Sequence, residues 1–538
     1  MRLSLNDLSD KNAWAAAGIG LPAYNVADAA ARARNAPIWV HFGAGNIFRG
    51  FIAGLQQSLL NKGLADRGII AAETFDFDII DSIYRPCDNL VMNVTLNSDA
   101  SVDCEIIASI AEAIRADGAG MARLTEIFSQ PDLRLVSFTI TEKGYVLRGA
   151  DGGLLPAAEA DMRAGPDKPR HAMGVAAALL YGRYAAGKLP LALVSMDNCS
   201  HNGEKLRAGV LEIAKGWIGN GFVDERFLKY LSDERVVSFP WSMIDKITPR
   251  PDKFIEMMLK NKGVEGMESI ITSGSTFIAP FVNAERPQYL IIEDSFPNGR
   301  PPLEHAGVYL TDRETVEKTE RMKVTACLNP LHTAMAVYGC LLGYERVSEE
   351  MKDPEITALI KRLGYTECLP VVTDPGIISP KAFIDEVINK RLPNPFIPDA
   401  PRRIASDTSQ KVGIRFGETI KSYIAEGRDL SGLVAVPLAI AGWLRYLLGV
   451  DDAGKTMDIS PDPMKDELTA RLKTVAWNEA DSYNGQILSI LSNARIFGSD
   501  LLQNVLGRRV EAYFQSMLNG PGAVRQTLKK ALMNVFDA

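Results

Sequence analysis

A strand, a glycine turn and a helix follow one another in APIWVHFGAGNIFRGFIAGLQQSLLNKG, and this order constrains the fold more than any other feature of the chain. The apolar residues 38–42 predict a buried strand, and the amphipathic pattern after the glycines predicts a helix. In dinucleotide-binding folds the first glycine permits a tight turn and the second lets the backbone approach a pyrophosphate. Gly43 and Gly45 take these positions, whereas Phe48 stands where a third glycine is usual. The segment therefore predicts an α/β fold with a Rossmann-type N-terminal domain; the alternative is that the glycines serve only the turn between strand and helix.

Two acids follow the next apolar segment, residues 68–72, which predicts a second strand. They are Glu73 and Asp76. A carboxylate at this position can accept hydrogen bonds from the ribose hydroxyls of NAD while repelling the extra phosphate of NADP. Either acid can play this part, and a solvated loop charge is the alternative for both. We expect NAD as the cofactor, with the choice between NAD and NADP open.

Polar clusters also follow two later strands, LRLVSFTITEKGY and LPLALVSMDNCSHNGEK. In open parallel sheets, ligands bind at the carboxyl ends of the strands. We therefore expect site residues at Thr141, Glu142, Lys143, Asp197 and Asn198. The alternative is that these acids and amides only cap turns or helices.

Composition narrows the classes of function. The chain has 538 residues, of which 46% are apolar, so we expect two or more domains. A net charge of −7 gives no electrostatic reason to bind nucleic acid or an anionic membrane, so the expected partner is a small molecule. The N-terminus lacks a secretion signal, and no stretch approaches ~18 apolar residues. Six scattered cysteines and five unpaired histidines predict no metal site, and a cytoplasmic location is expected.

The domain boundary is predicted from a change in pattern. Two short strands around a proline and glycine turn, in YLIIEDSFPNGRPPLEHAGVYLTD, close the first domain. Helical patterns such as PLHTAMAVYGCLLGY and LVAVPLAIAGWLRYLLG dominate the rest. We expect a Rossmann-type domain over residues 1–310 and a mostly α-helical domain for substrate binding and catalysis over residues 311–538.

The segment KVTACLNPLHTAMAVYGC brings together a lysine, a carboxamide and an imidazole, at Lys323, Asn329 and His332. These three groups can oxidise an alcohol without a metal, because a base can take the hydroxyl proton while hydride leaves. The alternatives are a solvated surface lysine and a buried structural histidine.

Seven motifs, in order from about His41 to about Arg415, resemble those of the polyol-specific long-chain dehydrogenases, the mannitol dehydrogenase family. They are HFGAGNIFRG, TITEKGY, SMDNCSHNG, SFPWSMIDKITP, IEDSFPNGRPPLEHAGV, MKVTACLNPLH and RIASDTSQK. The resemblance implies NAD(P)-dependent hydride transfer between a secondary alcohol and a ketone. It also implies a Rossmann-type N-terminal domain and a helical C-terminal domain, with no metal.

The resemblance also implies roles for individual residues. Lys323 resembles the general acid/base, and Asn198 and Asn329 resemble the carboxamides that bind the reacting oxygen. His332 resembles an imidazole that orients the substrate. The remaining matches are a basic pair, an acid near the lysine and the cofactor motif, at Arg403, Lys411, Asp245, Gly43, Gly45, Asn46, Phe48 and Arg49.

The catalytic segment departs from the family pattern in one respect. The family usually has four residues between the lysine and the asparagine, and here there are five, from Val324 to Leu328. On a regular helix the extra residue would turn Lys323 by about 100° relative to Asn329. Either a π-bulge absorbs it, or the helix begins only at Pro330 and Asn329 is its N-cap.

The substrate is inferred from the wording of the motifs. HFGAGNIFRGF and CLNPLHT look closer to the motifs of family members that act on D-mannonate than to those of mannitol dehydrogenases. This resemblance predicts that the protein interconverts D-mannonate and D-fructuronate. An arginine can hold the substrate carboxylate through two parallel hydrogen bonds, and Arg250 and Arg402 are the candidates. The alternatives are a neutral polyol dehydrogenase acting on mannitol or arabinitol, and a non-catalytic protein that binds a sugar acid. The oligomeric state is open.

Overall fold

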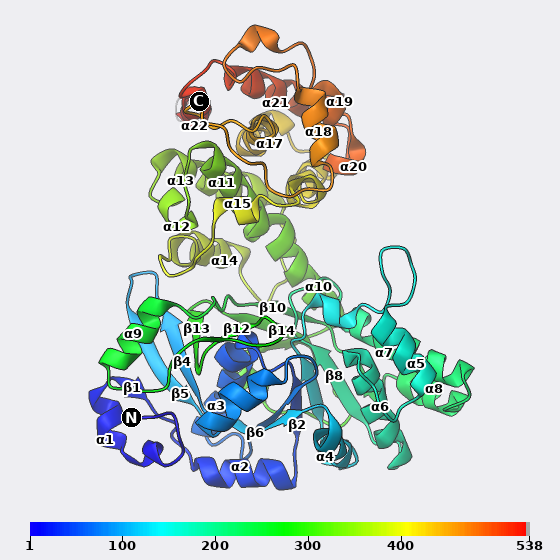
Figure 1. The fold of residues 1–538 in the computed structure, drawn as a ribbon. Helices are drawn as coiled ribbons and strands as arrows, with labels where there is room; N and C mark the ends of the chain where they lie inside the picture. The colour runs from blue at the N-terminus through cyan, green and yellow to red at the C-terminus, as the bar shows by residue number, and fades with distance from the viewer. Residues whose placement is uncertain (534–538) are drawn as a thin grey trace. The chain divides into compact units, whose positions relative to one another are not determined.

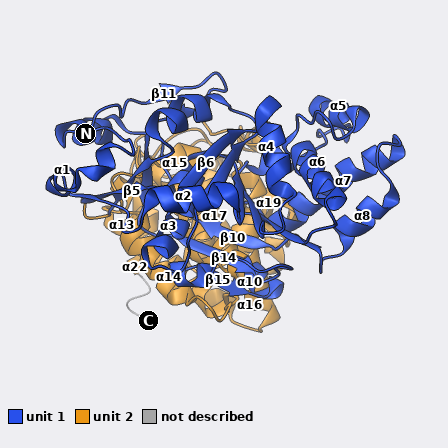
Figure 2. Ribbon diagram, turned by 90° about the horizontal axis from the view of Figure 1, so that it is seen from below, with its two compact units in different colours: residues 1–97, 101–317 blue, residues 98–100, 318–538 orange. Residues whose placement is uncertain are grey.

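The computed structural model describes residues 1–533, which divide into two compact units (Figure 2). The first unit comprises Met1–Asn97 and Ser101–Glu317. The second comprises Ser98–Ala100 and the chain from Lys318 onward. The division falls inside helix α10 (Arg313–Met322).

The first unit is built on a parallel sheet of six strands (Figure 1). In spatial order these are β6 (Ile110–Arg115), β3 (Ile69–Glu73), β2 (Trp39–Phe42), β7 (Leu135–Phe138), β8 (Leu191–Ser195) and β9 (Val237–Ser238). Numbered along the chain, this is the order 3-2-1-4-5-6 of doubly wound nucleotide-binding sheets. The order reverses between β2 and β7, which pair in parallel.

Both faces of this sheet are buried, as its continuous apolar strands require. Val40 and Phe42 belong to one core, and Trp39, which precedes them and points to the opposite face, belongs to the other. The first of these cores contains residues of α4 (Gly118–Phe128), α6 (Ala172–Ala185) and α7 (Asn202–Gly219). The second contains residues of the π-helical turn η2 (Phe48–Ile52) and of α3 (Ala53–Asn61).

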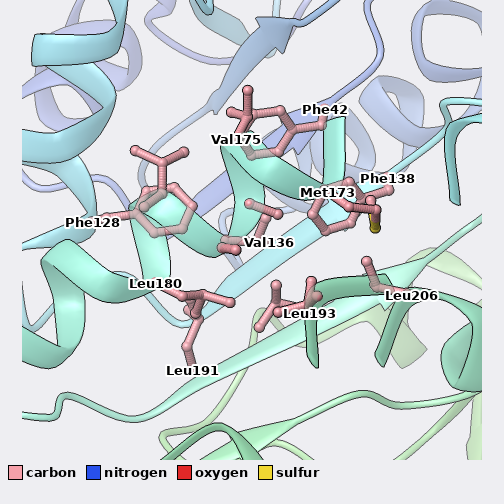
Figure 3. Packing of buried hydrophobic residues seen from close by; sticks show 14 of the residues in the cluster. Phe42, Phe128, Val136, Phe138, Met173, Val175, Leu180, Leu191, Leu193 and Leu206 are labelled. Carbon is pink, nitrogen blue, oxygen red and sulfur yellow. The ribbon is translucent and has the colours of Figure 1, made fainter. Parts of the chain in front are cut away.

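Aromatic side chains fill the first core at the end of the strands (Figure 3). The ring of Phe42 stacks on that of Phe138 with centroids 5.2 Å apart and meets Phe128 edge-on at 6.4 Å. Burying such rings stabilises the fold by about 2–3 kcal/mol each. The carboxyl ends of β2 and β7, where a ligand is expected, are thereby held on a rigid base.

A buried guanidinium closes the edge of this core. Arg183, on α6, is 0% exposed and donates to five backbone carbonyls at 2.7–3.2 Å. The acceptors belong to the loops before β7 and β8, at Phe128, Gln130, Leu133, Leu189 and Pro190. One side chain thus satisfies the carbonyls of two loops that would otherwise be buried without donors.

Three smaller sheets and further helices complete the first unit. The sheets have the orders β10-β14-β15, β1-β5-β4-β13 and β11-β12. Their strands are β10 (Ser242–Asp245), β14 (Tyr289–Glu293), β15 (Tyr309–Thr311), β1 (Ile19–Gly20), β5 (Val102–Ile107), β4 (Val91–Leu96), β13 (Phe281–Glu285), β11 (Ile270–Ile271) and β12 (Phe277–Ile278). The other helices are α1 (Lys11–Ala16), α2 (Val26–Asn35), α5 (Pro156–Ala164), α8 (Glu225–Ser232) and α9 (Lys253–Asn261).

The second unit is helical. Its centre is formed by α11 (Asn329–Leu341) and α17 (Ala435–Tyr446), and every residue of α17 is buried. A helix buried on all sides must be surrounded by other elements. The other helices of this unit are α12 (Val347–Glu350), α13 (Pro354–Lys361), α14 (Pro380–Glu386), α15 (Pro401–Ile404), α16 (Glu418–Ala425), α18 (Lys465–Leu472), α19 (Leu488–Leu491), α20 (Ala494–Phe497), α21 (Val505–Ser516) and α22 (Ala523–Met533).

The predicted fold class is confirmed: a Rossmann-type sheet comes first in the chain, and a helical unit follows. Over residues 1–533, no helix is both long enough and apolar enough to cross a bilayer. All six cysteines are free thiols, and five of them are buried.

Candidate active site

The turn after β2 requires glycine at its first position. Gly43 has φ of +103°, and a Cβ there would lie 2.1 Å from the carbonyl oxygen of Thr139. Its N–H donates to the Ala72 carbonyl at 2.9 Å, which ties the turn to β3. The tight turn inferred from the sequence is therefore present, and the reason is the close approach of the loop after β7.

Gly45 differs, because no atom lies within 4 Å of the position that a Cβ would take. The helix that continues into η2 begins at Asn46, directly after this open position. The first N–H groups of a helix have no partner within the helix, and together with the helix dipole they favour an anion. The open space at Gly45 and these N–H groups match what a pyrophosphate needs, so the turn is suited to hold a dinucleotide.

Side chains further along this motif are buried. Phe48 is 0% exposed and stacks on His41 with centroids 4.3 Å apart. Arg49 is also 0% exposed and donates to the Ala279 carbonyl at 2.6 Å. Burial lowers the pKa of His41 to about 3, so this imidazole is neutral. Both side chains of the motif therefore pack in the core, while Asn46 stands at the helix start.

Glu73, at the end of β3, is bound to the backbone of two loops. Its Oε2 accepts from the N–H of Ala44 at 2.9 Å, and its Oε1 accepts from the N–H groups of Thr74 and Phe75 at 2.9 Å. The carboxylate thus fixes the glycine turn against β3 and leaves one lone pair on Oε2. Asp76 is buried, and its Oδ2 accepts from the hydroxyl of Thr272 at 2.5 Å.

A cavity of about 250 Å³ opens at the carboxyl ends of the strands. It lies at the point where the strand order reverses, because its lining comes from the segments after β2, β7 and β8 and from the end of β10. The lining residues are Ile47, Thr141, Glu142, Met196, Asp197, Asn198, Ile244 and Lys246. Four of the five residues predicted at these strand ends line the cavity, whereas the fifth, Lys143, is exposed and does not line it.

Asp197 shapes the wall of this cavity. Its carboxylate accepts from the N–H groups of Ile140 at 2.9 Å and Thr141 at 3.0 Å, and from the Tyr145 hydroxyl at 2.6 Å. Burial raises the pKa of Asp197 above its usual range, while these hydrogen bonds oppose the shift. Thr141 has φ of +64°, which is unfavourable for a β-branched residue. The carboxylate therefore holds a strained residue in the cavity wall.

The other predicted residues of the first unit lie on or after β10. Asp245 is buried at the end of this strand and is 6% exposed. Arg250 is exposed, and its carbonyl accepts from the side chain of Asn283 at 3.0 Å. Asn198 is exposed at the rim of the cavity, and Glu142 pairs with Lys205 at the surface.

In the second unit, Lys323 opens the π-helical turn η7 (Lys323–Cys327). The N–H of Leu328 donates to the Lys323 carbonyl at 3.1 Å, a bond that spans five residues. The turn is thus a π-bulge that takes up the extra residue of this segment, the first of the two alternatives given by the sequence. The second alternative, a helix that begins at Pro330 with Asn329 as its N-cap, is not found, since α11 begins at Asn329 and its N-cap is Leu328. The Lys323 side chain is buried, at 3% exposed.

His332 lies in the first turn of α11, one turn after Asn329. Its Nε2 is 3.7 Å from Oδ2 of Asp399. Burial lowers the pKa of His332 to about 4, although Asp399 opposes the shift. The imidazole is therefore neutral at neutral pH and can accept or donate a hydrogen bond.

Of the basic pair in the RIASDTSQK motif, Arg403 lies near this histidine, and its charge acts on the imidazole. Arg403 pairs with Asp399, and Nζ of Lys411 donates to the Ser406 carbonyl at 2.6 Å. Burial and the charge of Arg415 lower the pKa of Lys411. Arg415 donates in turn to the hydroxyl of Thr333, next to His332.

Asp399 and Arg415 are the residues of this group that sequence reasoning missed as site residues. Asp399 precedes Arg403 by four residues, a spacing typical of helical ion pairs, and this signal could have identified it. Arg415 gave no local signal, because its contact is with a distant helix. In residues 1–533, no three histidines, cysteines or acids are grouped as a metal site would need.

A doubly wound parallel sheet with an open glycine turn at its first strand defines a dinucleotide-binding protein of the Rossmann type. The sequence matches the mannitol dehydrogenase Rossmann domain over residues 37–305 and the mannitol dehydrogenase C-terminal domain over residues 315–518. The chain therefore belongs to the mannitol dehydrogenase family, which confirms the resemblance inferred from the motifs.

Individual relatives agree. A D-mannonate oxidoreductase of Thermotoga maritima is 50% identical over 538 residues, covering 99% of either chain. The solved mannitol 2-dehydrogenase of Pseudomonas fluorescens, a ternary complex with NAD and D-mannitol, is 26% identical, with a TM-score of 0.68 and 100% of both chains covered. A D-sorbitol dehydrogenase, solved in substrate-free form, is 25% identical, with a TM-score of 0.76 and coverage of 96% and 97%.

Proposed function

We propose that the protein interconverts D-mannonate and D-fructuronate by NAD-dependent hydride transfer. The observation that carries this proposal is the 50% identity to a D-mannonate oxidoreductase over 99% of both chains. The solved relatives named for neutral polyols are 25% and 26% identical. The sugar acid is therefore favoured over a neutral polyol as the substrate.

The first unit would hold the cofactor. Space at Gly45 and the N–H groups of the following helix suit the pyrophosphate, and Oε2 of Glu73 retains a lone pair for a ribose hydroxyl. When bound, NAD supplies the acceptor for the hydride. Thr141 and Asn198 line the cavity at the switch point of the sheet, where ligands of such sheets bind.

Lys323 would act as the general acid/base. Its Nζ accepts the hydroxyl proton of D-mannonate during oxidation and returns a proton to the ketone of D-fructuronate during reduction. Its side chain is buried, at 3% exposed. Asn329 would donate to the reacting oxygen as negative charge develops, an effect worth about 3 kcal/mol. Neutral His332 would orient the substrate hydroxyls.

The location that suits this proposal is the cytoplasm. All six cysteines are thiols, including the partly exposed Cys199, and thiols persist in a reducing compartment.

The test compares two ketones with the same enzyme. Initial rates of NADH oxidation are measured at neutral pH with D-fructuronate and with D-fructose, and NADPH replaces NADH in a parallel series. We expect a preference for fructuronate of at least 100-fold in kcat/KM, about 2.7 kcal/mol in transition-state binding. A preference for fructose would assign the chain to the neutral polyol dehydrogenases. Binding of D-mannonate without turnover of either ketone would indicate a non-catalytic protein.

A further inference from the structure

Arg415 is a half-buried cation that pairs with no acid among residues 1–533. It lies on the π-helical turn η12 (Gly413–Gly417), and its one side-chain hydrogen bond goes from Nη1 to the hydroxyl of Thr333. Over the described residues 1–533, no carboxylate lies within ion-pair distance of its guanidinium. Burial lowers the pKa of Arg415 to about 10, and no neighbouring acid counters the shift. A guanidinium partly removed from water without an anion is less favourable than a paired one, so an anion that reached it would be bound.

The acids near Arg415 are already engaged elsewhere. Asp399 is shared between Arg403 and His332. Asp462 accepts from the N–H groups of Ser409 and Met464 at 2.8 and 2.9 Å. Asp407 is exposed, and its charge acts on Lys411.

Positive charge is therefore in excess around His332. Arg403 and Arg415 both lower the pKa of the His332 imidazole, and both lower that of Lys411. An anion that entered this cluster would relieve the mutual repulsion of its cations.

The backbone that carries Arg415 is fixed. A Cβ at Gly417 would lie 2.0 Å from the Phe497 carbonyl oxygen, and one at Gly413 would lie 2.7 Å from that of Ile496. Only glycine permits this approach of η12 to the end of α20. On the other side, the Thr333 hydroxyl that receives Nη1 donates to the Asn329 carbonyl at 3.0 Å. The guanidinium is thus held in place against the first turn of α11, next to the proposed catalytic residues.

We propose that Arg415 binds the carboxylate of the sugar-acid substrate and sets the preference for sugar acids over neutral ketoses and polyols. Nη1 is occupied by Thr333, which leaves Nε and Nη2 as a pair of parallel donors. This edge of a guanidinium matches the two oxygens of a carboxylate. The proposal rests on the proposed function, because it names how that substrate is recognised.

The two arginines suggested by the sequence are less suited to this role. Arg402 is 60% exposed at its side chain and pairs with Asp458 at 3.0 Å. Arg250 is exposed in the first unit. A charge that is solvated or already paired gains little from a substrate carboxylate, whereas Arg415 gains its missing counter-charge.

The test measures kcat/KM for D-fructuronate and D-fructose with NADH in the wild type, Arg415→Gln and Arg415→Lys. In Arg415→Gln we expect the ratio of the two values to fall at least 30-fold, mainly through a higher KM for fructuronate. Arg415→Lys restores the charge but not the paired donors, so an intermediate ratio is expected. Arg428→Gln is the matched control, because Arg428 is an exposed arginine of the same unit paired with Glu426. Its ratio should equal that of the wild type.

Binding gives a second measurement that does not depend on turnover. Calorimetric titration of D-mannonate into the enzyme with NADH should show a dissociation constant raised at least 30-fold by Arg415→Gln. Titration of D-mannitol should show a much smaller change. If Arg415→Gln does not fold, the ratio and affinities of Arg415→Lys decide the matter.

The outcomes separate the two proposals. A wild type that prefers fructose overturns the proposed function, and this inference with it. A wild type that prefers fructuronate, together with an unchanged ratio in Arg415→Gln, overturns only the role of Arg415. If Arg415→Gln lowers kcat/KM equally with both ketones, Arg415 only supports α11, and carboxylate recognition is refuted. Loss of the preference in Arg402→Gln or Arg250→Gln instead would transfer the role to that arginine.

Discussion

Replacing Glu350 with glutamine should remove a pH dependence from the stability of the second unit. Glu350 ends α12, is 0% exposed, and neither of its carboxyl oxygens has a hydrogen-bond partner. It faces Gly339, where a Cβ would lie 1.6 Å from Oε1. Burial, aided by the charge of Asp353, raises its pKa from 4.5 to about 9. The native protein therefore keeps Glu350 protonated at neutral pH.

The sign and size of the effect follow from linkage. Between pH 4.5 and 9 the unfolded chain releases this proton while the folded chain retains it. Stability contributed by Glu350 is thus fully present below pH 4.5 and falls as the pH rises, by about 1.4 kcal/mol per pH unit. Glutamine does not titrate. The free energy of unfolding of Glu350→Gln minus that of the wild type should therefore rise by about 4 kcal/mol from pH 5.5 to 8.5. Any constant cost of burying the amide cancels in this difference.

The assay is urea unfolding at four pH values from 5.5 to 8.5, after refolding by dilution has been verified. Tryptophan fluorescence and far-ultraviolet circular dichroism follow the transitions, and coincident curves support a two-state treatment of each one. Glu349→Gln, at the exposed neighbour, is the matched control and should run parallel to the wild type. Parallel lines for Glu350→Gln would refute the argument, because they would mean that native Glu350 is ionised.

Three further substitutions test the site and the fold. Lys323→Met should lower kcat for D-mannonate oxidation by about 10²–10⁴-fold, the usual contribution of a general base, as measured by NADH absorbance. Glu73→Ala should raise the Michaelis constant for NAD about tenfold, because the Ala44 N–H loses its acceptor and the glycine turn loosens. Arg183→Met should destabilise the first unit by about 3 kcal/mol or more, because five carbonyls lose their donor, and differential scanning calorimetry measures the shift.

Each of these has a control with the same change at an exposed position. Lys352→Met, Glu126→Ala and Arg226→Met should behave as the wild type. Lys323→Met with near-normal kcat would exclude the lysine as the base. An unaltered Michaelis constant in Glu73→Ala would show that the turn holds its shape without the carboxylate. A small shift in Arg183→Met would mean that water replaces the lost donors.

The sheet could be predicted from the sequence because its strands are buried on both faces. Such strands are continuous apolar runs, as in IWVHF and LALVS, and polar residues follow them where ligands bind. The cluster at Thr141, Glu142, Asp197 and Asn198 was located by this rule, and the cavity gathers all four. Local sequence was sufficient here, because position along a strand determines which end of the sheet a residue reaches.

Contacts between distant loops could not be predicted in this way. Glu73 was a candidate for the ribose, yet its main partners are N–H groups of the glycine turn and of its own loop. Asp197 likewise binds the backbone of the segment after β7. Arg415 lies 82 residues from Thr333, and no spacing rule connects them. These roles depend on tertiary geometry, which residue type and spacing do not specify.

The π-helical turn at η7 has a consequence for how this chain tolerates insertions and deletions. A wide turn takes up one additional residue locally, so the helix after it keeps its rotational phase. Deleting Val324 would therefore be expected to convert the wide turn into an ordinary one while α11 keeps its orientation. Sequence length just before Asn329 can then drift during evolution without disturbing the chemistry downstream. Alignment by fixed motif spacing would misplace the lysine in such chains, whereas alignment by structure would not.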